Sequence, residues 1–177
     1  MSAQGMKVMA KITLGGEVVA GYNSMTNLGG VDLAEYVEVP SLEWSMERDV
    51  DSNAQIRGHV HLGRVRFQKY IDGATPLIAQ ALSRGQTAEV EFKLFTNASD
   101  GADAELMTIT CLNGRLSGQS FEHGTSPEAS KGRGRTTMGS LESCSLAYET
   151  IQIQHAGEHG GQTETEISWT TGGNALG

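Results

Sequence analysis

Strict alternation of apolar and polar residues in short segments is the feature that most limits how this chain can fold. The clearest segments lie at residues 6–14, 88–94, 107–111 and 165–169. Successive side chains of a β-strand point to opposite faces, so each segment predicts a strand with one buried and one solvated face. Glycines, 23 of 177 residues against only three prolines, separate these segments. The sequence therefore predicts a mainly β protein.

Three alternating segments change phase midway, which indicates bulges or bends. The apolar positions shift from odd to even numbers at Pro40, from even to odd across Gly63, and from even to odd after Tyr148. A shift of one residue moves every following side chain to the other face of the sheet. Bulges of this kind curl a sheet. We therefore predict a closed or nearly closed antiparallel β-barrel of about eight strands.

One short helix, over about residues 76–84, is well marked within this β pattern. Thr75 suits the N-cap, Pro76 the first helical position and Gly85 the left-handed position after the last turn. The apolar residues with the spacing of one helix face are Leu77, Ile78, Ala81 and Leu82. The helix is expected to be an accessory that docks on the barrel.

Two polar segments, 47–58 and 122–137, separate predicted strands and are expected to be loops. Asn113-Gly114 has the sequence of a tight hairpin turn. The sequence contains no internal repeat. A chain of 177 residues and 18.8 kDa fits one domain or a tight pair of very small ones.

Composition and charge exclude several classes of protein. The net charge is −8, from 21 acidic and 13 basic residues, whereas a nucleic-acid-binding domain should be basic or carry a dense basic stripe. No apolar run approaches the roughly 18 residues that span a bilayer. The N-terminus lacks the basic flank and apolar stretch of a secretory signal. We expect no nucleic-acid partner, no membrane insertion, synthesis in the cytoplasm, and any export by a route that needs no signal peptide.

The chain offers little that is typical of an active site. His59 and His61 share one face of a predicted strand and are placed to serve as two metal ligands, or are exposed or interface histidines. Cys111 and Cys144 fit buried apolar positions in strands, with a disulfide or a reactive thiol as alternatives. No serine lies in a nucleophile-elbow motif. We expect no catalytic residue, no cofactor and no metal, and predict a binding or structural protein.

The segment from His59 to Gln86 contains the most specific pattern of the chain. A stretch with two histidines precedes a strand that ends in a Phe-x-Lys-x-x-Asp motif, and a Thr-Pro-x-x helix follows and stops at a glycine. The segment resembles the Hcp family, the haemolysin-coregulated proteins that form the inner tube of bacterial type VI secretion systems. The residues that carry the resemblance are His59, His61, Phe67, Lys69, Asp72, Thr75, Pro76, Leu77 and Gly85. Downstream, 141–151 resembles a late strand of that family, and Ser168-Trp169 resembles the aromatic of its last strand.

The motif residues have plain structural roles. Asp72 suits the turn that leaves the strand. Phe67, Leu77 and Leu82 are expected to form the core between helix and barrel. The resemblance also implies one bent strand through Asn113-Gly114, with a bulge there in place of the hairpin turn. We interpret the motif as a scaffold of packing and capping residues rather than a catalytic site.

The resemblance implies a mechanical function for a single Hcp-like domain over residues 1–177. Hexameric rings would stack into a tube, tipped by a spike protein, that a contractile sheath drives into a target cell. Small effector proteins would travel in the lumen, and the protein would pass from the bacterial cytoplasm to the extracellular space or target cell without a signal peptide. A tail-tube protein of a phage or other contractile injection particle is the related alternative. A small-ligand barrel or hydrolase, which would be a monomer with an apolar pocket, is a further alternative.

The polar segment 47–58 is predicted to make contacts between stacked rings, because it is long and joins two strands at one end of the barrel. Its candidate contact residues are Glu47, Arg48, Asp49, Asp51, Asn53, Gln55 and Arg57. A hexamer would carry six times −8 charges, so part of its wall should be acidic and suited to a basic sheath or cargo.

Overall fold

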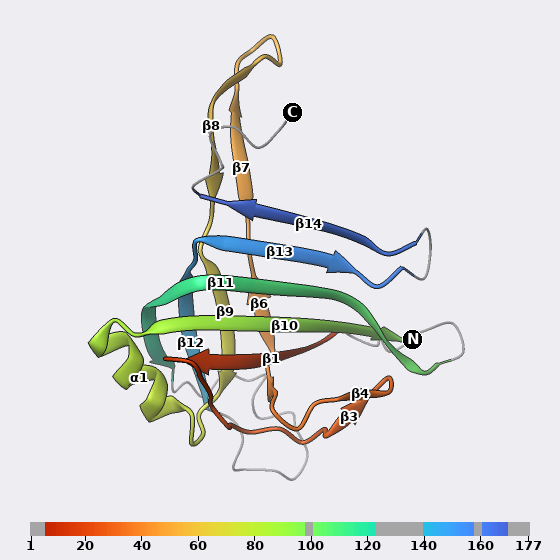
Figure 1. The fold of residues 1–177 in the computed structure, drawn as a ribbon, viewed down its shortest axis with the longest axis vertical. Coiled ribbons are helices and arrows are strands. Elements are labelled where there is room, and N and C mark those ends of the chain that lie inside the picture. The colour runs from red at the N-terminus through yellow and green to blue at the C-terminus, as the bar shows by residue number, and fades with distance from the viewer. Residues whose placement is uncertain (1–5, 98–100, 123–139, 158–160, 170–177) are drawn as a thin grey trace.

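The structure is a computed structural model that describes residues 6–97, 101–122, 140–157 and 161–169. A body of β-strands carries one short helix at its lower end, and a long β-hairpin projects from its upper end (Figure 1). The N-terminal strands are β1 (Lys7–Leu14), β2 (Glu17–Val18), β3 (Asn27–Leu28), β4 (Val31–Asp32), β5 (Val37–Glu38) and β6 (Ser41–Glu43). The middle elements are β7 (Met46–Val50), β8 (Ile56–Leu62), β9 (Val65–Tyr70) and α1 (Thr75–Arg84). The C-terminal strands are β10 (Thr87–Asn97), β11 (Asp103–Glu122), β12 (Leu141–Ala147), β13 (Thr150–His155) and β14 (Thr163–Ser168).

The prediction of a mainly β fold is confirmed, but the main sheet is open and has more than eight strands, so it is not the closed or nearly closed barrel of about eight strands that the sequence predicts. Ten strands form the sheet, in the order β2-β1-β10-β11-β12-β9-β6, with β13 beside β11, β14 beside β13, and β5 beside β1. The segment 37–43 lies between the two edges of this path: its first half pairs with β1 and its second half with β9. Pro40 divides the halves and has no backbone N–H to donate. No single ladder therefore joins the edges, although the mainly β fold and the one short helix are as predicted.

The predicted alternation is confirmed in the main sheet, where residues opposite one another in register share a face. The row that faces the core consists of Ile12, Val90, Cys111, Ile151 and Ile167. The neighbouring row, which faces the other side, consists of Lys11, Glu91, Thr110, Gln152 and Glu166. Cys111 and Cys144 are both buried and free, which confirms their interpretation as small core side chains. The expectation for the last strand is wrong at its end, because Trp169 is 53% exposed.

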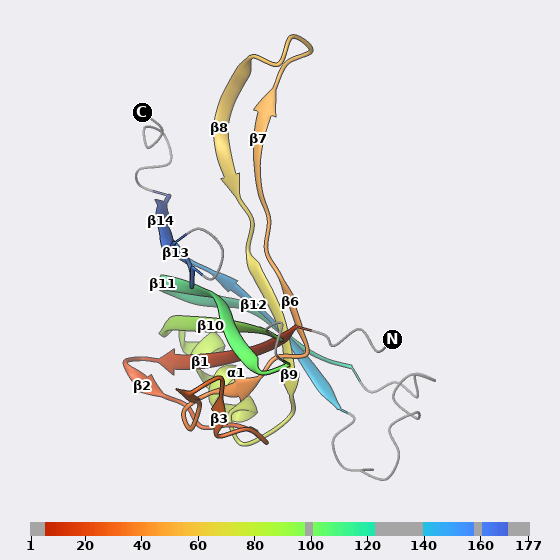
Figure 2. The same ribbon diagram turned by 90° about the vertical axis from the view of Figure 1, so that its right-hand side faces the viewer.

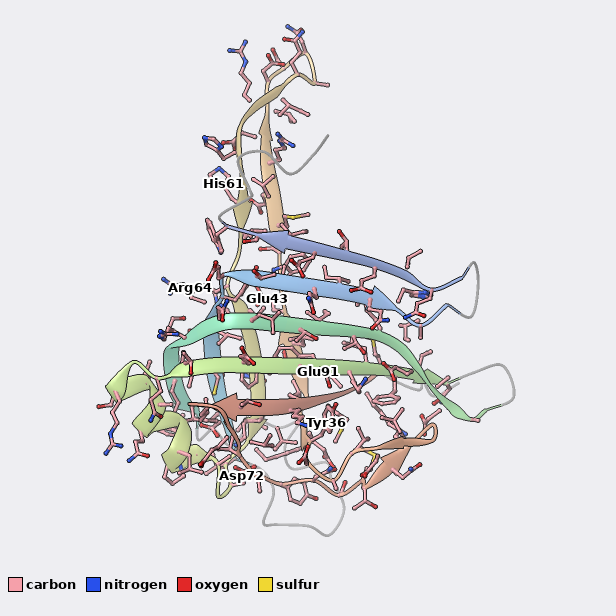
Figure 3. All side chains as sticks on the ribbon, in the orientation of Figure 1. Tyr36, Glu43, His61, Arg64, Asp72 and Glu91 are labelled. Carbon is pink, nitrogen blue, oxygen red and sulfur yellow. The ribbon has the colours of Figure 1, made fainter. Side chains whose placement is uncertain are left out.

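The polar face of β1 and β10 is covered by the segment that contains β3 and β4. A second, smaller apolar cluster forms there from Met9, Leu28, Leu33, Tyr36 and Phe95. The Tyr36 hydroxyl donates a hydrogen bond to Glu91, and both residues are labelled in Figure 3. Lys11 pairs with Glu35. Burial, followed by the hydrogen bond to Glu91, raises the pKa of Tyr36. The sheet is thus covered on both faces at β1 and β10.

Strand β11 bends at Asn113-Gly114, as the bulge interpretation predicts. Asn113 has a φ of +50°, and the strand changes partner here, from β13 up to Leu112 to β12 from Arg115 onward. A Cβ at Gly114 would lie 2.6 Å from the carbonyl oxygen of Ala88 and 2.8 Å from another backbone carbonyl oxygen. Only glycine fits between the two neighbouring backbones.

The substitution Gly114→Ala is expected to destabilise the fold by about 2 kcal/mol, because both contacts are with backbone that cannot move aside. Urea unfolding of the variant measures the change. Gly73→Ala is the matched control, since a Cβ there meets nothing within 4 Å, and it should change stability by less than about 0.5 kcal/mol. Equal stability of the two variants would contradict the steric argument.

Helix α1 has the predicted extent but a different cap. It begins at Thr75 with Ala74 in the N-cap position and no side-chain cap, and it ends at Gly85 with a φ of 63°. The Thr75 hydroxyl instead donates a hydrogen bond to Glu142, so its predicted N-cap role is wrong. Ile78 and Ala81 are buried against the sheet. Leu77 is 43% exposed and lies outside the core in which it was expected, because it occupies the solvent side of the first turn.

Of the two segments expected to be loops, the structure describes 47–58 in full. It is a β-hairpin, because β7 and β8 pair with each other around a tight turn. Charged residues on consecutive positions hide the alternation that marks a strand. The other expected loop, 122–137, lies outside the described residues apart from the end of β11.

Candidate functional site

Three of the family-motif residues, Lys69, Asp72 and Thr75, meet at a buried ion cluster beside the first turn of α1. Lys69 on β9 has no exposed surface, and its Nζ donates to Glu142 Oε1 at 2.6 Å and to Asp72 Oδ1 at 2.7 Å. A third bond runs to the carbonyl oxygen of Tyr70 at 2.7 Å. Glu142 on β12 is also fully buried. One cation thus lies between two carboxylates.

Every carboxylate oxygen of the cluster has a donor. Glu142 accepts from the Thr75 hydroxyl at 2.7 Å and from Gln119 Nε2 at 2.6 Å. Asp72 accepts from the backbone N–H groups of Ala74 and Tyr22 at 2.8 and 2.6 Å. Among the described residues, no buried side-chain polar atom lacks a partner. The cluster joins β9, β11, β12 and α1, and a complete set of hydrogen bonds is what lets buried charges stabilise one packing arrangement.

The structure therefore divides the predicted motif into separate parts. Lys69, Asp72 and Thr75 belong to the cluster, whereas Phe67 lies in the core and Pro76 and Gly85 only begin and end the helix. His59 and His61 lie on the hairpin. Figure 3 shows His61 above the body and Asp72 near the lower end of the molecule. The analysis of the sequence missed Glu142 and Gln119. Glu142 shares the even-numbered, core-facing positions of Cys144 and Leu146, and a charge at such a position indicates a buried partner.

The hairpin of β7 and β8 is the most exposed part of the described chain. It rises well above the body in both views (Figures 1 and 2). Every residue of β7 is exposed, as are all residues of β8 except Val60 and Leu62. An isolated two-stranded hairpin is at best marginally stable in water. Its length and exposure therefore point to a contact with another molecule.

Asp51 holds the tip of the hairpin in a defined turn. Its Oδ1 accepts from the backbone N–H groups of Asn53 and Gln55, both at 2.9 Å. Its Oδ2 accepts from Arg57 Nε at 3.1 Å. The backbone hydrogen bond from Gln55 is the largest of the influences that lower the pKa of Asp51. The tip is thus ordered by its own side chains.

Trp44 and Tyr148 hold the base of the hairpin to the body. Trp44 Nε1 donates to the Tyr148 hydroxyl at 2.6 Å, and this hydroxyl donates to the carbonyl oxygen of Gly63 at 2.8 Å. Gly63 N–H in turn donates to the carbonyl oxygen of Ser45 at 2.9 Å. Desolvation raises the pKa of Tyr148, which remains a neutral donor at physiological pH. The hairpin therefore leaves the body in a fixed direction.

The two faces of the hairpin differ in chemistry. Cross-strand pairs of mostly apolar residues line one face: Met46 with Leu62, Arg48 with Val60, and Val50 with Ile56. Val50 and Ile56 are 62% and 61% exposed. Glu47, Asp49 and His61 lie on the opposite face, where His61 Nε2 is 3.2 Å from Asp49 Oδ2. Exposed apolar side chains at this density favour contact with a protein.

The predicted ring-contact residues all lie on this hairpin. Glu47, Arg48 and Asp49 belong to β7, and Arg57 belongs to β8. Asp51, Asn53 and Gln55 form the turn between the strands. The sequence reasoning named the polar residues and missed the exposed Val50–Ile56 pair.

The remaining chemical candidates do not assemble into a reactive centre. Within the described ranges, no three His, Cys, Asp or Glu side chains form a group that could hold a metal ion, and His61 pairs only with Asp49. Burial raises the pKa of the Cys111 and Cys144 thiols to about 12, so neither is a thiolate at neutral pH. The helix of the described chain is not long and apolar enough to cross a membrane.

An open β-sheet fixed by a buried ion cluster, with a rigid exposed hairpin, defines a scaffold that presents a surface to other proteins. The sequence model described as "Type VI secretion system effector, Hcp" matches residues 29–155. The chain therefore belongs to the Hcp family, whose members are structural tube proteins of the type VI secretion system and not enzymes. The suspected resemblance is confirmed, and the match favours this system over a phage tail tube.

Solved structures show the same fold at low sequence identity. The Hcp1 protein of E. coli is 20% identical with a TM-score of 0.73, covering 93% of this chain and 99% of its own. Hcp3 of Pseudomonas aeruginosa is 16% identical with a TM-score of 0.63, covering 93% and 99%. Hcp1 of Salmonella typhimurium is 14% identical with a TM-score of 0.66, covering 94% and 97%. A search of curated protein sequences finds no match.

Proposed function

We propose that residues 1–177 form one Hcp-like subunit that assembles into hexameric rings, and that the rings stack into the inner tube of a type VI secretion system. The observation that supports assembly is the hairpin of β7 and β8, with its exposed apolar Val50–Ile56 pair and a base fixed by Trp44 and Tyr148. A rigid exposed apolar surface is costly for a free monomer and useful in an assembly.

The hairpin makes the contacts between stacked rings in this proposal. Its tip is ordered by Asp51 without any help from the body, so it can enter a neighbouring ring with little loss of conformational entropy. Its contact set then includes the apolar pair Val50–Ile56 beside the polar residues named from the sequence.

The tube would act with a contractile sheath, a spike protein at its tip and small effector proteins in its lumen. Charge supports a basic partner. On the β1–β10 half of the sheet, Lys7, Lys11 and Lys93 pair with carboxylates. Among the described residues no cation pairs with Glu164 or Glu166 on β14. The β13–β14 half of the sheet is therefore acidic. Such contacts would weaken with salt, since the screening length is about 8 Å at physiological ionic strength.

Proteins of this family are secreted through the type VI system. In the proposal the chain is made in the bacterial cytoplasm and leaves as part of the tube, without a signal peptide, for the extracellular space or the target cell.

The solution mass of the purified protein tests the proposal. Light scattering should give a mass near six times 18.8 kDa, and negative-stain electron microscopy of the same peak should show sixfold rings. A monomer at every concentration, without rings on the grid, would contradict the assembly and favour a small-ligand barrel.

A further inference from the structure

Two of the five histidines of the chain, His59 and His61, lie on strand β8 of the exposed hairpin. They are two residues apart, and both side chains are exposed. Figure 3 shows His61 above the body of the molecule. Histidine is the side-chain type that changes its charge between pH 5 and 8. The hairpin that is proposed to contact the neighbouring ring therefore carries two side chains of this type.

The groups of β7 that face the histidines are acidic. Glu47 lies directly opposite His61 in the register of β7 and β8. The Asp49 carboxylate lies on the same face, 3.2 Å from His61 Nε2. In the described chain, β7 is the one strand that pairs with β8. A protonated His61 therefore forms an ion pair with Asp49 across the two strands, and opposite charges in this arrangement stabilise strand pairing.

The two arginines of the hairpin leave this acidic face unchanged. Arg57 Nε donates to the Asp51 carboxylate at the tip, at 3.1 Å. Arg48 lies opposite Val60, on the other face of the hairpin. With neutral histidines, the carboxylates of Glu47 and Asp49 thus determine the charge of the face that carries His59 and His61.

Protonation of both histidines reverses the net charge of the hairpin. Residues 46–62 contain three acidic and two basic side chains, so their net charge is −1 with neutral histidines and +1 with both protonated. The other 18 acidic and 11 basic residues give the rest of the chain a net charge of −7. At neutral pH the hairpin and the rest of a neighbouring subunit therefore carry charge of the same sign, and mild acid makes the signs opposite.

We propose that the hairpin is a pH-sensitive contact: protonation of His59 and His61 strengthens the stacking of rings, and their deprotonation weakens it. This inference rests on the proposed stacking through the hairpin and adds how that contact is regulated. Two effects act in the same direction. The ion pair with Asp49 stabilises the hairpin, and a positive hairpin is attracted to an acidic neighbour. The histidines lie opposite the apolar face with Val50 and Ile56, so their charge adds to the apolar contact.

The pH dependence of tube formation tests the inference. Between pH 8 and pH 6, the lowest protein concentration that gives tubes should fall at least about tenfold. A factor of about 1.5 in each of the six contacts of a hexameric ring multiplies to about ten. Sedimentation and negative-stain electron microscopy measure this concentration at one ionic strength, because salt screens the charges. Ordinary Asp and Glu side chains protonate below this pH range.

Two double variants separate the charge of the histidines from other effects of pH. H59Q/H61Q is neutral throughout and should need, at both pH values, the concentration that the wild type needs at pH 8. H59K/H61K is positive throughout and should form tubes at pH 8 at the concentration that the wild type needs at pH 6. H155Q is the matched control, because His155 lies at the end of β13 in the body, and it should keep the full response to pH.

Each outcome decides the inference. Three results would overturn the role of the histidines and leave the stacking intact: equal wild-type concentrations at pH 8 and pH 6, a pH response retained by H59Q/H61Q, or a folded H59K/H61K that needs the wild-type concentration of pH 8. Absence of wild-type tubes at both pH values would overturn the stacking proposal itself. Thermal unfolding by circular dichroism monitors the fold; if H59K/H61K is unfolded, H59Q/H61Q decides alone, because it introduces no charge.

Discussion

Replacement of the hairpin by a short turn is expected to abolish tubes and leave hexameric rings. Met46 and Leu62 are paired across the two strands, so residues 47–61 can be replaced by Asn-Gly without moving the body. The removed residues contribute almost nothing to the core, since all but Val60 of the strands are exposed. The fold should therefore survive while the proposed contact between rings is lost. Negative-stain electron microscopy detects tubes, and the mass from light scattering shows whether hexameric rings form.

A milder variant separates loss of the apolar contact from loss of the whole hairpin. V50K/I56K keeps the turn held by Asp51 but replaces the exposed apolar pair, and should raise the concentration required for tubes at least about tenfold. M6K/V18K is the matched control, because Met6 and Val18 are also exposed apolar residues but lie elsewhere. Normal tubes from the shortened protein would contradict the proposal. Monomers in place of rings would assign the hairpin to contacts within a ring.

The sequence predicts the individual strands of the body well, because half-buried strands leave a period of two. The break at Pro40 was also predictable, since a phase change is a local signal. Asn113-Gly114 has the local sequence of a hairpin turn, and only the resemblance to the family indicated the bend. Closure of the sheet was not predictable. It depends on which distant strands the two halves of 37–43 join, and no local pattern encodes those partners.

The hairpin illustrates the opposite case. Glu47, Arg48 and Asp49 are consecutive charges, so the segment has the sequence of a loop. Its strands form because Asp51 closes the turn and places Val50 opposite Ile56, which becomes visible only in three dimensions. A strand that is exposed on both faces needs no alternation of apolar and polar residues, so its sequence does not mark it as a strand.

The buried cluster was half predictable. Lys69, Asp72 and Thr75 are close in sequence and form one motif, so their proximity follows from the local chain. Glu142 is 73 residues away from Lys69 and joins them only because β12 pairs with β9. The available signal was the charge of Glu142 at a core-facing position of β12. A buried charge requires a partner of opposite charge, but the sequence does not identify which residue that is.

The substitution Lys69→Met is expected to cause the largest loss of stability of any single change discussed. It leaves the carboxylates of Glu142 and Asp72 in the interior without their shared cation. Removal of one partner from a buried ion pair costs about 3–5 kcal/mol, because the remaining charge stays desolvated. For a chain of this size the midpoint of thermal unfolding should fall by roughly 10–15 °C. Circular dichroism at a concentration where both proteins share one assembly state measures the shift.

Two further variants identify the cause of that loss. Lys7→Met removes the half-exposed bridge to Asp103 and should cost less than about 1 kcal/mol, because solvent screens such pairs. K69M/E142Q removes two opposite buried charges together and should recover part of the stability that K69M loses, since one uncompensated carboxylate is gone. If K69M were as stable as K7M, the cluster would contribute no more than a surface bridge. If the double variant were much less stable than K69M, the hydrogen bonds of Glu142 to Thr75 and Gln119 would outweigh its charge.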